Sequence, residues 1–518
     1  MNIATNADLI LCNATILTMD VQHPFAEAVA ISGNIILSVG SNKSVDRFRS
    51  RHTRVIDCNK LPIHPGFVDA HIHPLAFAKH LSSVKCSGPD IENISDILTK
   101  LNPISAPIHT GEWITGVDYD NEVLAERRHP TRWDLDVHTP DNPVRLIHRS
   151  GHAMVLNSYA LKLAGINADT SDPVDGVIVR SGTSSEPTGV FLDANDFLRQ
   201  RLGAITSEAD IARSMRMVND VLLSYGITSI QDAGHTNGLH RWNTLHRLIA
   251  SEQLQTRTTM MISSRSALEF HDYGMQFGTG DLMLRLGHVK QMLTSSTGTF
   301  LPSLEDLTNN VRSAHEKGFP VAIHAVEEDA VLMATVALTD GLSCTLPAPD
   351  RIEHCSEAPS HIRQAVIKCG ATVVTQPGFI YWRKEQYEKH PKPESLYPIA
   401  ALREIGIPIA FSSDAPVIDP NPWPGIHAML LSDFQYDSST PCSEQVPYAK
   451  ISQALYSYTL ASARSEGLES FKGSLVSGKL ADLVVSSLSV DEAIANPEGV
   501  SAAMTIINGQ IVRDILTQ

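Results

Sequence analysis

The sequence predicts an α/β fold, a (β/α)8 barrel of the TIM type with a small β-sandwich domain built from both ends of the chain. Three observations predict it. Short apolar runs alternate with helical stretches through the middle of the chain, and nearly every run ends in a polar side chain able to do chemistry. The two ends are instead rich in short β-forming runs and turns. Because 518 residues are too many for one ordinary core, several domains are expected.

The two ends of the chain have similar β-rich patterns. The first contains ADLILCNATILT and AEAVAISGNIILSVG, with a turn at Gly33-Asn34, and the last contains GKLADLVVSS and MTIINGQIV, with a turn at Asn508-Gly509. Each end alone is too small to bury a core. We therefore expect residues 1–65 and 471–518 to form one small β domain together.

Eight apolar runs between residues 66 and 470 have the spacing of barrel strands. They are FVDAHIH, TSIQDAG, TRTTMMIS, HVKQML, PVAIHAV, RIEHC, TVVTQP and PIAFSSDAP. Residues from about 85 to 205 interrupt the alternation with segments such as GEWITGVDYD. We therefore expect a barrel over residues 66–470 that carries an insertion after its first strand.

Composition is that of a soluble globular protein, and a reducing cytoplasm is its simplest setting. The formal net charge of −16 disfavours nucleic acid or an anionic membrane as partner. No run of 18 apolar residues and no basic N-terminal region is present, so neither a membrane span nor a secretion signal is expected. The seven cysteines form no C-x-x-C pair, which suits a reducing compartment. The oligomeric state stays open, a homo-oligomer included.

The first barrel run, in GFVDAHIHP, carries two candidate metal ligands. Alternate side chains of a strand share a face, so Asp69, His71 and His73 should point the same way, with Asp69 placed to support the histidines. Imidazole nitrogen suits zinc and related divalent metals. In a chain with 22 histidines the H-x-H pattern also arises by chance, so alone it is weak.

Later strand ends strengthen the prediction. His324 and His354 each end an apolar run, where a lone histidine would usually be a hydrogen-bonded core residue. Four histidines at one barrel mouth would repel each other if protonated, whereas a bound cation would hold them neutral. Asp414 adds a carboxylate that can serve as ligand and as base.

Lys290, in GHVKQML, allows two interpretations. A lysine inside a barrel is costly unless paired or modified, and an ammonium group cannot bind a metal. Carboxylation by carbon dioxide would turn it into an anionic bridge between two metals. Otherwise it would pair with an acid such as Glu327 or point outward.

The ordered set of motifs resembles the amidohydrolase superfamily. GFVDAHIHP is similar to its first-strand signature, HVK, AIHA, RIEH and SSDAP to its later ligand strands, and GSLVSGKLADLVV to its closing segment. RHPTRWDLD, PVRLIHRSGHAMVLNSYALKLAGI, EPTGVF and GITSIQDAG resemble the YtcJ-like branch, which includes N-substituted formamide deformylase. The resemblance covers essentially the whole chain.

The resemblance implies a metal-dependent hydrolase with one or two divalent ions, zinc above all. The positions that match metal ligands are His71, His73, Lys290 in carboxylated form, His324, His354 and Asp414. Asp414 also matches the catalytic base, which takes a proton from metal-bound water as the hydroxide attacks a carbonyl-type carbon. Two departures concern the substrate and the metal count: KQMLTSSTG lacks an Asp-Gly pair, and HAVEEDAV stands where many members have Gly-Asp.

Three further residues are candidate substrate contacts. His152 lies in a segment that caps the barrel mouth in the resembling branch. Gln376 ends a barrel run, and Tyr381 follows it in QPGFIYWRKEQY beside Trp382 and Arg383. Ordinary packing within the insertion or loop is the alternative for each.

The expected function is hydrolysis of a non-peptide carbon–nitrogen bond in an N-substituted amide or formamide. The same site would also serve a deaminase, a cyclic amidase or an esterase. A non-catalytic barrel with a regulatory role is an alternative of another class. Retention of the four histidines, Lys290 and Asp414 argues against it, since such a barrel has no need of the full set.

Overall fold

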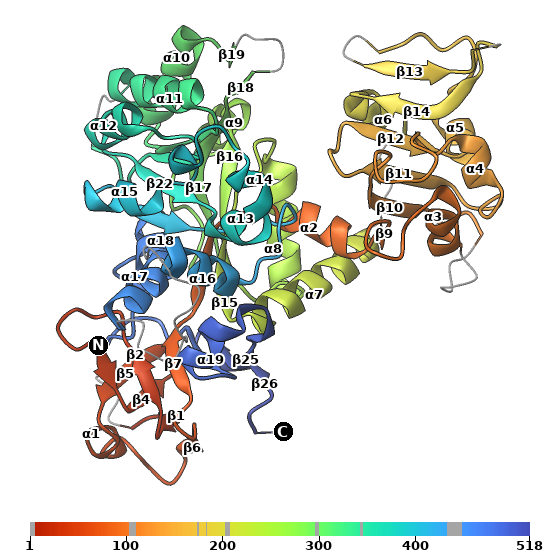
Figure 1. The fold of residues 1–518 in the computed structure, drawn as a ribbon. Helices are drawn as coiled ribbons and strands as arrows, with labels where there is room; N and C mark the ends of the chain where they lie inside the picture. Colours follow the sequence, from red (N-terminus) through yellow and green to blue (C-terminus); the bar gives the residue numbers. More distant parts are fainter. Residues whose placement is uncertain are drawn as a thin grey trace. The chain divides into compact units, whose positions relative to one another are not determined.

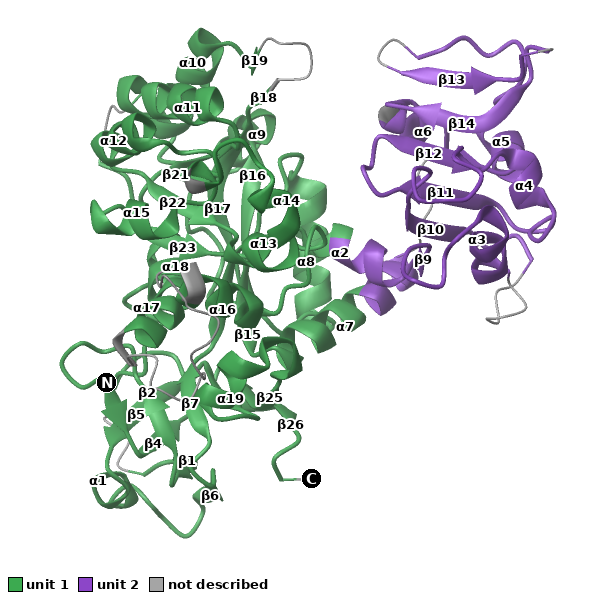
Figure 2. Ribbon diagram, in the orientation of Figure 1, with its two compact units in different colours: residues 1–76, 215–518 green, residues 77–214 purple. Residues whose placement is uncertain are grey.

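The computed structural model describes residues 6–102, 110–173, 176–182, 184–202, 208–295, 300–341, 345–432 and 448–517. The chain forms two compact units (Figure 2). Unit 1 consists of Met1–Ala76 and Met215–Gln518, and unit 2 consists of Phe77–Ser214.

Unit 1 contains an eight-stranded parallel sheet, and each of the eight predicted runs forms one of its strands. In sheet order they are β8 (Phe67–Ile72), β15 (Ile227–Asp232), β16 (Arg257–Ser263), β17 (Leu284–Met292), β20 (Val321–Ala325), β21 (Arg351–His354), β22 (Thr372–Thr375) and β23 (Ile409–Phe411). The predicted barrel architecture is confirmed.

The two edges of this sheet meet just beyond β23. Asp414 N donates to His71 O over 2.8 Å, and His73 N donates to Ala415 O over 3.0 Å. These two backbone hydrogen bonds join the end of β8 to the segment that follows β23. They curl the sheet into a nearly closed barrel (Figure 1).

Helices follow the barrel strands and lie around the sheet (Figure 1). Among them are α8 (Leu239–Ala250), α9 (Ser264–Asp272), α10 (Leu304–Glu316), α11 (Glu328–Gly341), α12 (Ser360–Cys369), α16 (Pro422–Ser432) and α17 (Tyr448–Tyr458). In α10, Ser303 caps the first turn, and Leu307, Val311 and Ala314 are buried at helical spacing. In the described part of the chain, no helix is both long enough and apolar enough to cross a membrane.

Both ends of the chain contribute to a pair of small sheets in unit 1. One sheet has the order β5 (Ile35–Gly40), β4 (Ala28–Ser32), β1 (Leu9–Cys12), β6 (Arg54–Asp57). The other has the order β26 (Gln510–Asp514), β25 (Ala502–Ile507), β24 (Leu483–Ser486), β7 (Pro62–Pro65), β2 (Thr15–Leu17), β3 (Phe25–Ala26). Their shared apolar core includes Ile16, Ile31, Leu483 and Met504. The two ends therefore fold together, as predicted.

Unit 2 follows the first barrel strand in the chain and has its own six-stranded sheet. The order is β13 (Val177–Arg180), β14 (Pro187–Leu192), β12 (Ala153–Leu156), β11 (Val144–His148), β10 (Ile114–Tyr119), β9 (Val84–Lys85). Helices α3 (Ile94–Leu101), α4 (Arg132–Asp136), α5 (Ser158–Ala164) and α6 (Asn195–Leu202) belong to the same unit. Separate apolar clusters lie around Leu146 and around Phe191.

A buried ion pair attaches the small domain to the barrel. Arg257, at the start of β16, donates from Nε and Nη2 to the two carboxylate oxygens of Asp482, over 2.6 and 2.9 Å. Asp482 directly precedes β24, and its Oδ1 also accepts from Asn508 N over 2.8 Å. The two paired side chains are only 3% and 4% exposed. Each buried charge therefore relies on the other for charge compensation that water would otherwise supply.

We expect Asp482→Ala to lower the free energy of unfolding of unit 1 by about 3–5 kcal/mol, because it leaves the Arg257 guanidinium buried and unpaired. Urea denaturation followed by circular dichroism measures the change. Asp46→Ala is the matched control, since its ion pair with Arg49 is largely exposed and should change stability by less than about 1 kcal/mol. Equal effects of the two substitutions would contradict a structural role for the buried pair.

Candidate active site

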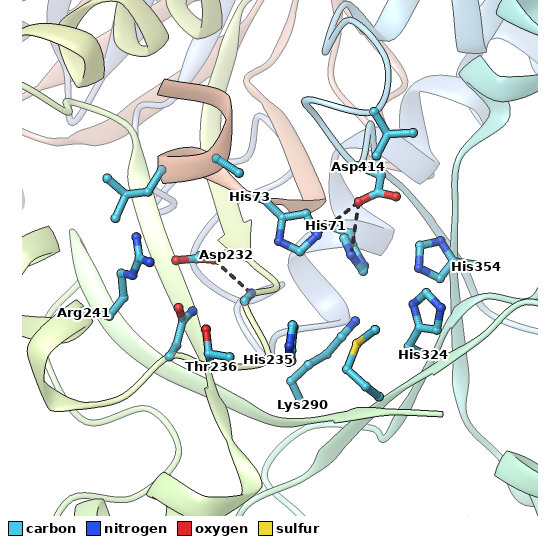
Figure 3. A pocket seen from close by; sticks show the side chains of 16 residues that line it. His71, His73, Asp232, His235, Thr236, Arg241, Lys290, His324, His354 and Asp414 are labelled. Atoms are coloured by element: carbon cyan, nitrogen blue, oxygen red, sulfur yellow. Dashed lines mark hydrogen bonds and ion pairs between the residues drawn. The ribbon is translucent and has the colours of Figure 1, made fainter. Parts of the chain in front are cut away.

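A cavity of about 400 Å3 opens where the barrel strands end. Unit 1 supplies its lining, and the predicted ligand positions make up one part of it (Figure 3). The lining residues are His71, His73, Leu75, Ala76, Asp232, Gly234, His235, Thr236, Asn237, Arg241, Lys290, Met292, His324, His354, Asp414 and Val417. All six predicted metal positions therefore face one cavity.

Asp414 lies beside His71, in β8, and His73, which follows that strand. Its Oδ1 is 3.2 Å from His73 Nε2 and 3.5 Å from His71 Nε2. Burial alone would raise the pKa of Asp414, but the hydrogen bond with His73 and the neighbouring imidazoles hold that pKa well below its usual range. The carboxylate is therefore ionised, as both a metal ligand and a base require.

Two of these residues have an unusual backbone. His354 has φ of 70° and Asp414 has φ of 59°, the left-handed region that costs a residue with a side chain about 1–2 kcal/mol. The hydrogen bond from Asp414 N to His71 O helps to fix the second of them. Both conformations occur where a strand ends and its side chain turns into the cavity, a frequent place for such strain in proteins.

Buried partners fix the orientation of two imidazoles. His71 Nδ1 is hydrogen-bonded to the Glu353 carboxylate, which also accepts from Arg351 Nε over 2.8 Å and from Arg351 Nη2 over 3.1 Å. His354 Nδ1 pairs with Gln376 Oε1 over 2.9 Å, and Gln376 Nε2 donates to Ser412 Oγ over 3.0 Å. In both rings Nδ1 is occupied and Nε2 remains as the donor atom for a metal.

The imidazoles of His71 and His324 are neutral at physiological pH. Burial and nearby Lys290 lower the pKa of His71 to about 3, although Glu353 acts in the opposite direction. Burial, His354 and Lys290 lower the pKa of His324 to about 2. The rings of His324 and His354 lie with centroids 4.5 Å apart, so two positive charges there would be unfavourable. Neutral imidazole is the form that binds a metal.

Lys290 is fully inside the protein and has no hydrogen-bond partner for Nζ among the described residues. Burial lowers its pKa to about 8, against the attraction of Glu353. The alternatives of pairing with Glu327 or pointing outward are therefore not observed. A buried amine without a partner is the orphaned group that metal binding or modification would satisfy.

These residues fit a divalent cation. Ligand atoms of His71, His73 and Asp414 all lie within 4.8 Å of one another. His324, His354 and Lys290 line the same cavity and could add ligands. Imidazole nitrogen with carboxylate oxygen is the donor set of catalytic zinc sites.

Sequence reasoning did not identify Glu353 and Arg351 as part of the site. Both belong to β21, where every residue is buried. An arginine and a glutamate inside one short apolar run could have indicated a buried ion pair from the sequence. Asp69 also differs from expectation, because it accepts from Ser413 N over 3.1 Å and from His71 N over 3.2 Å rather than from an imidazole. It holds backbone in place, while Glu353 orients the ring of His71.

The three candidate substrate contacts lie outside the cavity lining. Gln376 is fully buried and bonds His354 and Ser412. Tyr381, in α13 (Pro377–Trp382), donates its hydroxyl to Glu498 over 2.8 Å. His152 belongs to unit 2, where its Nδ1 is 2.7 Å from Asp193 Oδ1 and its side chain is 78% exposed. Substrate contact by these three residues stays a prediction, and the observed hydrogen bond of Gln376 orients His354.

The chain is similar to known proteins over most of its length. It is 27% identical to N-substituted formamide deformylase from Arthrobacter pascens, with 92% of this chain and 93% of that protein covered. It is 25% identical to the putative amidohydrolase YtcJ of Bacillus subtilis, with 96% and 98% covered.

Solved structures share its fold. An uncharacterised metal-dependent hydrolase from Pyrococcus horikoshii superposes with a TM-score of 0.75 at 20% identity, covering 92% of this chain and 96% of that one. Atrazine chlorohydrolase TrzN from Arthrobacter aurescens, solved with zinc, gives a TM-score of 0.56 at 15% identity, with 98% and 95% covered.

The model of the amidohydrolase family matches residues 54–513, a range that contains all eight barrel strands and every residue of the cavity. Fold, cavity and sequence thus agree, and the chain belongs to the amidohydrolase family as a hydrolase that acts on carbon–nitrogen bonds.

Proposed function

We propose that this protein is a metal-dependent hydrolase that cleaves the non-peptide carbon–nitrogen bond of an N-substituted amide or formamide. The convergence of an ionised Asp414, four histidines and an unpartnered Lys290 on one cavity carries this proposal. The formamide is favoured by the likeness to N-substituted formamide deformylase over nearly the whole chain. A cavity of about 400 Å3 suits a small molecule.

One or two ions would be held by His71, His73, His324, His354, carboxylated Lys290 and Asp414. A bound divalent metal lowers the pKa of water and polarises a carbonyl oxygen. Zinc is the ion we propose, because nitrogen and oxygen ligands of this kind are typical of catalytic zinc sites.

Asp414 would act as the base. Its carboxylate is ionised and lines the cavity beside His73, so it can take a proton from the attacking water. The same group can then give that proton to the leaving nitrogen as the carbon–nitrogen bond breaks. Glu353 and Gln376 would keep the imidazoles of His71 and His354 in one orientation throughout.

Lys290 would be carboxylated. Its lowered pKa leaves part of the amine unprotonated near neutral pH, and a free amine can attack carbon dioxide. The ammonium first loses one proton to solvent, and the free amine loses a second as its nitrogen–carbon bond to carbon dioxide forms, so a buried cation becomes an anionic carbamate. The carbamate would bind the metal, and this contact would replace the hydrogen bond that Lys290 Nζ lacks.

Metal content tests the ligand set first. Purified protein should contain one or two equivalents of a divalent ion by elemental analysis, and the double variant His71→Ala/His73→Ala should lose most of it. His23→Ala is the control, because this histidine is 80% exposed and lies outside the cavity lining. Protein without stoichiometric metal after growth with added zinc would refute the metal site.

Asp414→Asn tests the base. We expect kcat to fall about 10²–10⁴-fold, because a positioned proton acceptor contributes that much. Screening N-substituted formamides, amides, ureas and hydantoins with metal added supplies the substrate and separates formamide hydrolysis from deamination or cyclic amide opening. Unchanged turnover in a variant that retains its metal would show that another group takes the proton.

Lys290→Ala should abolish most activity, and formate, acetate or propionate should restore part of it by replacing the carbamate. Protein equilibrated with ¹³C-bicarbonate should show a carbamate resonance by ¹³C NMR, and Lys290→Ala should lack it. A wild-type spectrum without this resonance, in protein loaded with metal, would exclude carboxylation.

A further inference from the structure

The cavity has a second polar wall that the ligand set does not use. It consists of the loop after β15 and the first turn of α8, with Asp232, Gly234, His235, Thr236, Asn237 and Arg241. Figure 3 shows Arg241 at one side of the cavity and His324 and His354 at the other. A substrate bound at the proposed metal would extend toward this wall.

Hydrogen bonds hold this loop in one conformation. Asp232 Oδ1 accepts from Gly234 N over 3.0 Å, and Asn237 Nδ2 donates to Met261 O over 3.0 Å. Ser263 N in turn donates to Asn237 O over 2.9 Å. A Cβ at Gly234 would lie 2.5 Å from Asn237 Oδ1, so a side chain there would displace the Asn237 side chain. The wall is therefore preformed.

Arg241 is a cation without an ion-pair partner among the described residues. Asp232 lines the same wall, but its carboxylate serves the loop backbone and makes no ion pair with Arg241. The guanidinium is always charged at physiological pH, and its planar fork matches a carboxylate. The cavity therefore offers one unused anion-binding group.

The position of Arg241 in the helix is also unfavourable for the helix itself. It lies in the first turn of α8, which contains no acidic residue and has no side-chain cap from Gly238. The helix dipole makes a cation in the first turn destabilising by a few tenths of a kcal/mol. Stabilisation of α8 thus does not explain the presence of Arg241. An anion bound at this wall, in contrast, would be attracted both by the Arg241 guanidinium and by the positive N-terminal end of α8.

We propose that Arg241 binds a carboxylate on the substrate, on the part of the molecule remote from the bond that is cleaved. The substrate class is then an N-substituted formamide or amide that carries a carboxylate on its nitrogen substituent. This inference rests on the proposed function for the identity of the cleaved bond. It adds a specificity-determining residue on a wall separate from the proposed ligands.

Matched substrate pairs test the proposal with the metal-loaded full chain. N-formylphenylalanine is compared with N-formyl-2-phenylethylamine, and N-formylleucine with N-formyl-3-methylbutylamine, because each pair differs only by the carboxylate. Arg241→Gln should raise KM for the acids by about tenfold to hundredfold and leave kcat and the neutral partners nearly unchanged. Arg241→Lys, which keeps the charge, should retain part of the preference.

Arg247→Gln is the matched control, since Arg247 lies on the same helix, is exposed and is absent from the cavity lining. It should behave as the wild type toward both members of each pair. The proposal is overturned if Arg241→Gln affects acids and neutral partners alike, or leaves the ratio between them unchanged.

Binding without turnover separates this inference from the proposed function. Calorimetric titration of both acids into metal-loaded Asp414→Asn protein should give a Kd that rises at least about tenfold when Arg241→Gln is added. Arg241-dependent binding in a protein that hydrolyses neither pair would support the carboxylate site and contradict the proposed function. If the protein hydrolyses these substrates but Arg241→Gln does not change their binding, the proposed function is supported and the carboxylate site is contradicted. If neither acid binds, the carboxylate site is overturned.

Discussion

The fully buried charge of Arg351 is the constraint on which the barrel interior depends. Its guanidinium donates to Glu353 within β21, to Gln231 Oε1 at the end of β15 and to Ala70 O in β8, the last over 2.6 Å. Three strands are thus joined by one side chain that no water reaches. Because a buried cation needs a matching anion, the charge of Glu353 is held in place as well, with a pKa well below its usual range.

Glu353 passes this constraint on to the cavity. Its carboxylate binds Arg351 on one side and His71 Nδ1 on the other, so the structural ion pair also sets the direction of an imidazole. The small domain is attached in the same manner by the Arg257–Asp482 pair, which joins β16 to the segment before β24. Both junctions use arginine, whose planar fork pairs with two carboxylate oxygens at once.

Sequence patterns predict the strands of this protein better than the contacts between them. Eight apolar runs were sufficient to place the barrel, and most of the polar residues at their ends line the cavity. The alternation of a strand gives the face of a side chain but not its partner. Glu353 is 282 positions from His71, and Asp69 is 344 positions from Ser413, so neither contact has a local pattern. Arg241 was missed for a related reason, because it lies on a helix turn that only the folded loop brings to the cavity.

The two backbone hydrogen bonds between the end of β8 and the segment after β23, here called the seam, limit which parts of the cavity can change during evolution. Asp414 N donates to His71 O and His73 N donates to Ala415 O, so Asp414 cannot move away from the two histidines without breaking these hydrogen bonds. The backbones of His71, His73 and Asp414 are therefore held together on one side of the cavity. Adaptation to new substrates must come from the wall opposite, where a change at one loop leaves the seam closed. The fold thereby separates a part that selection must conserve from a part that it can vary.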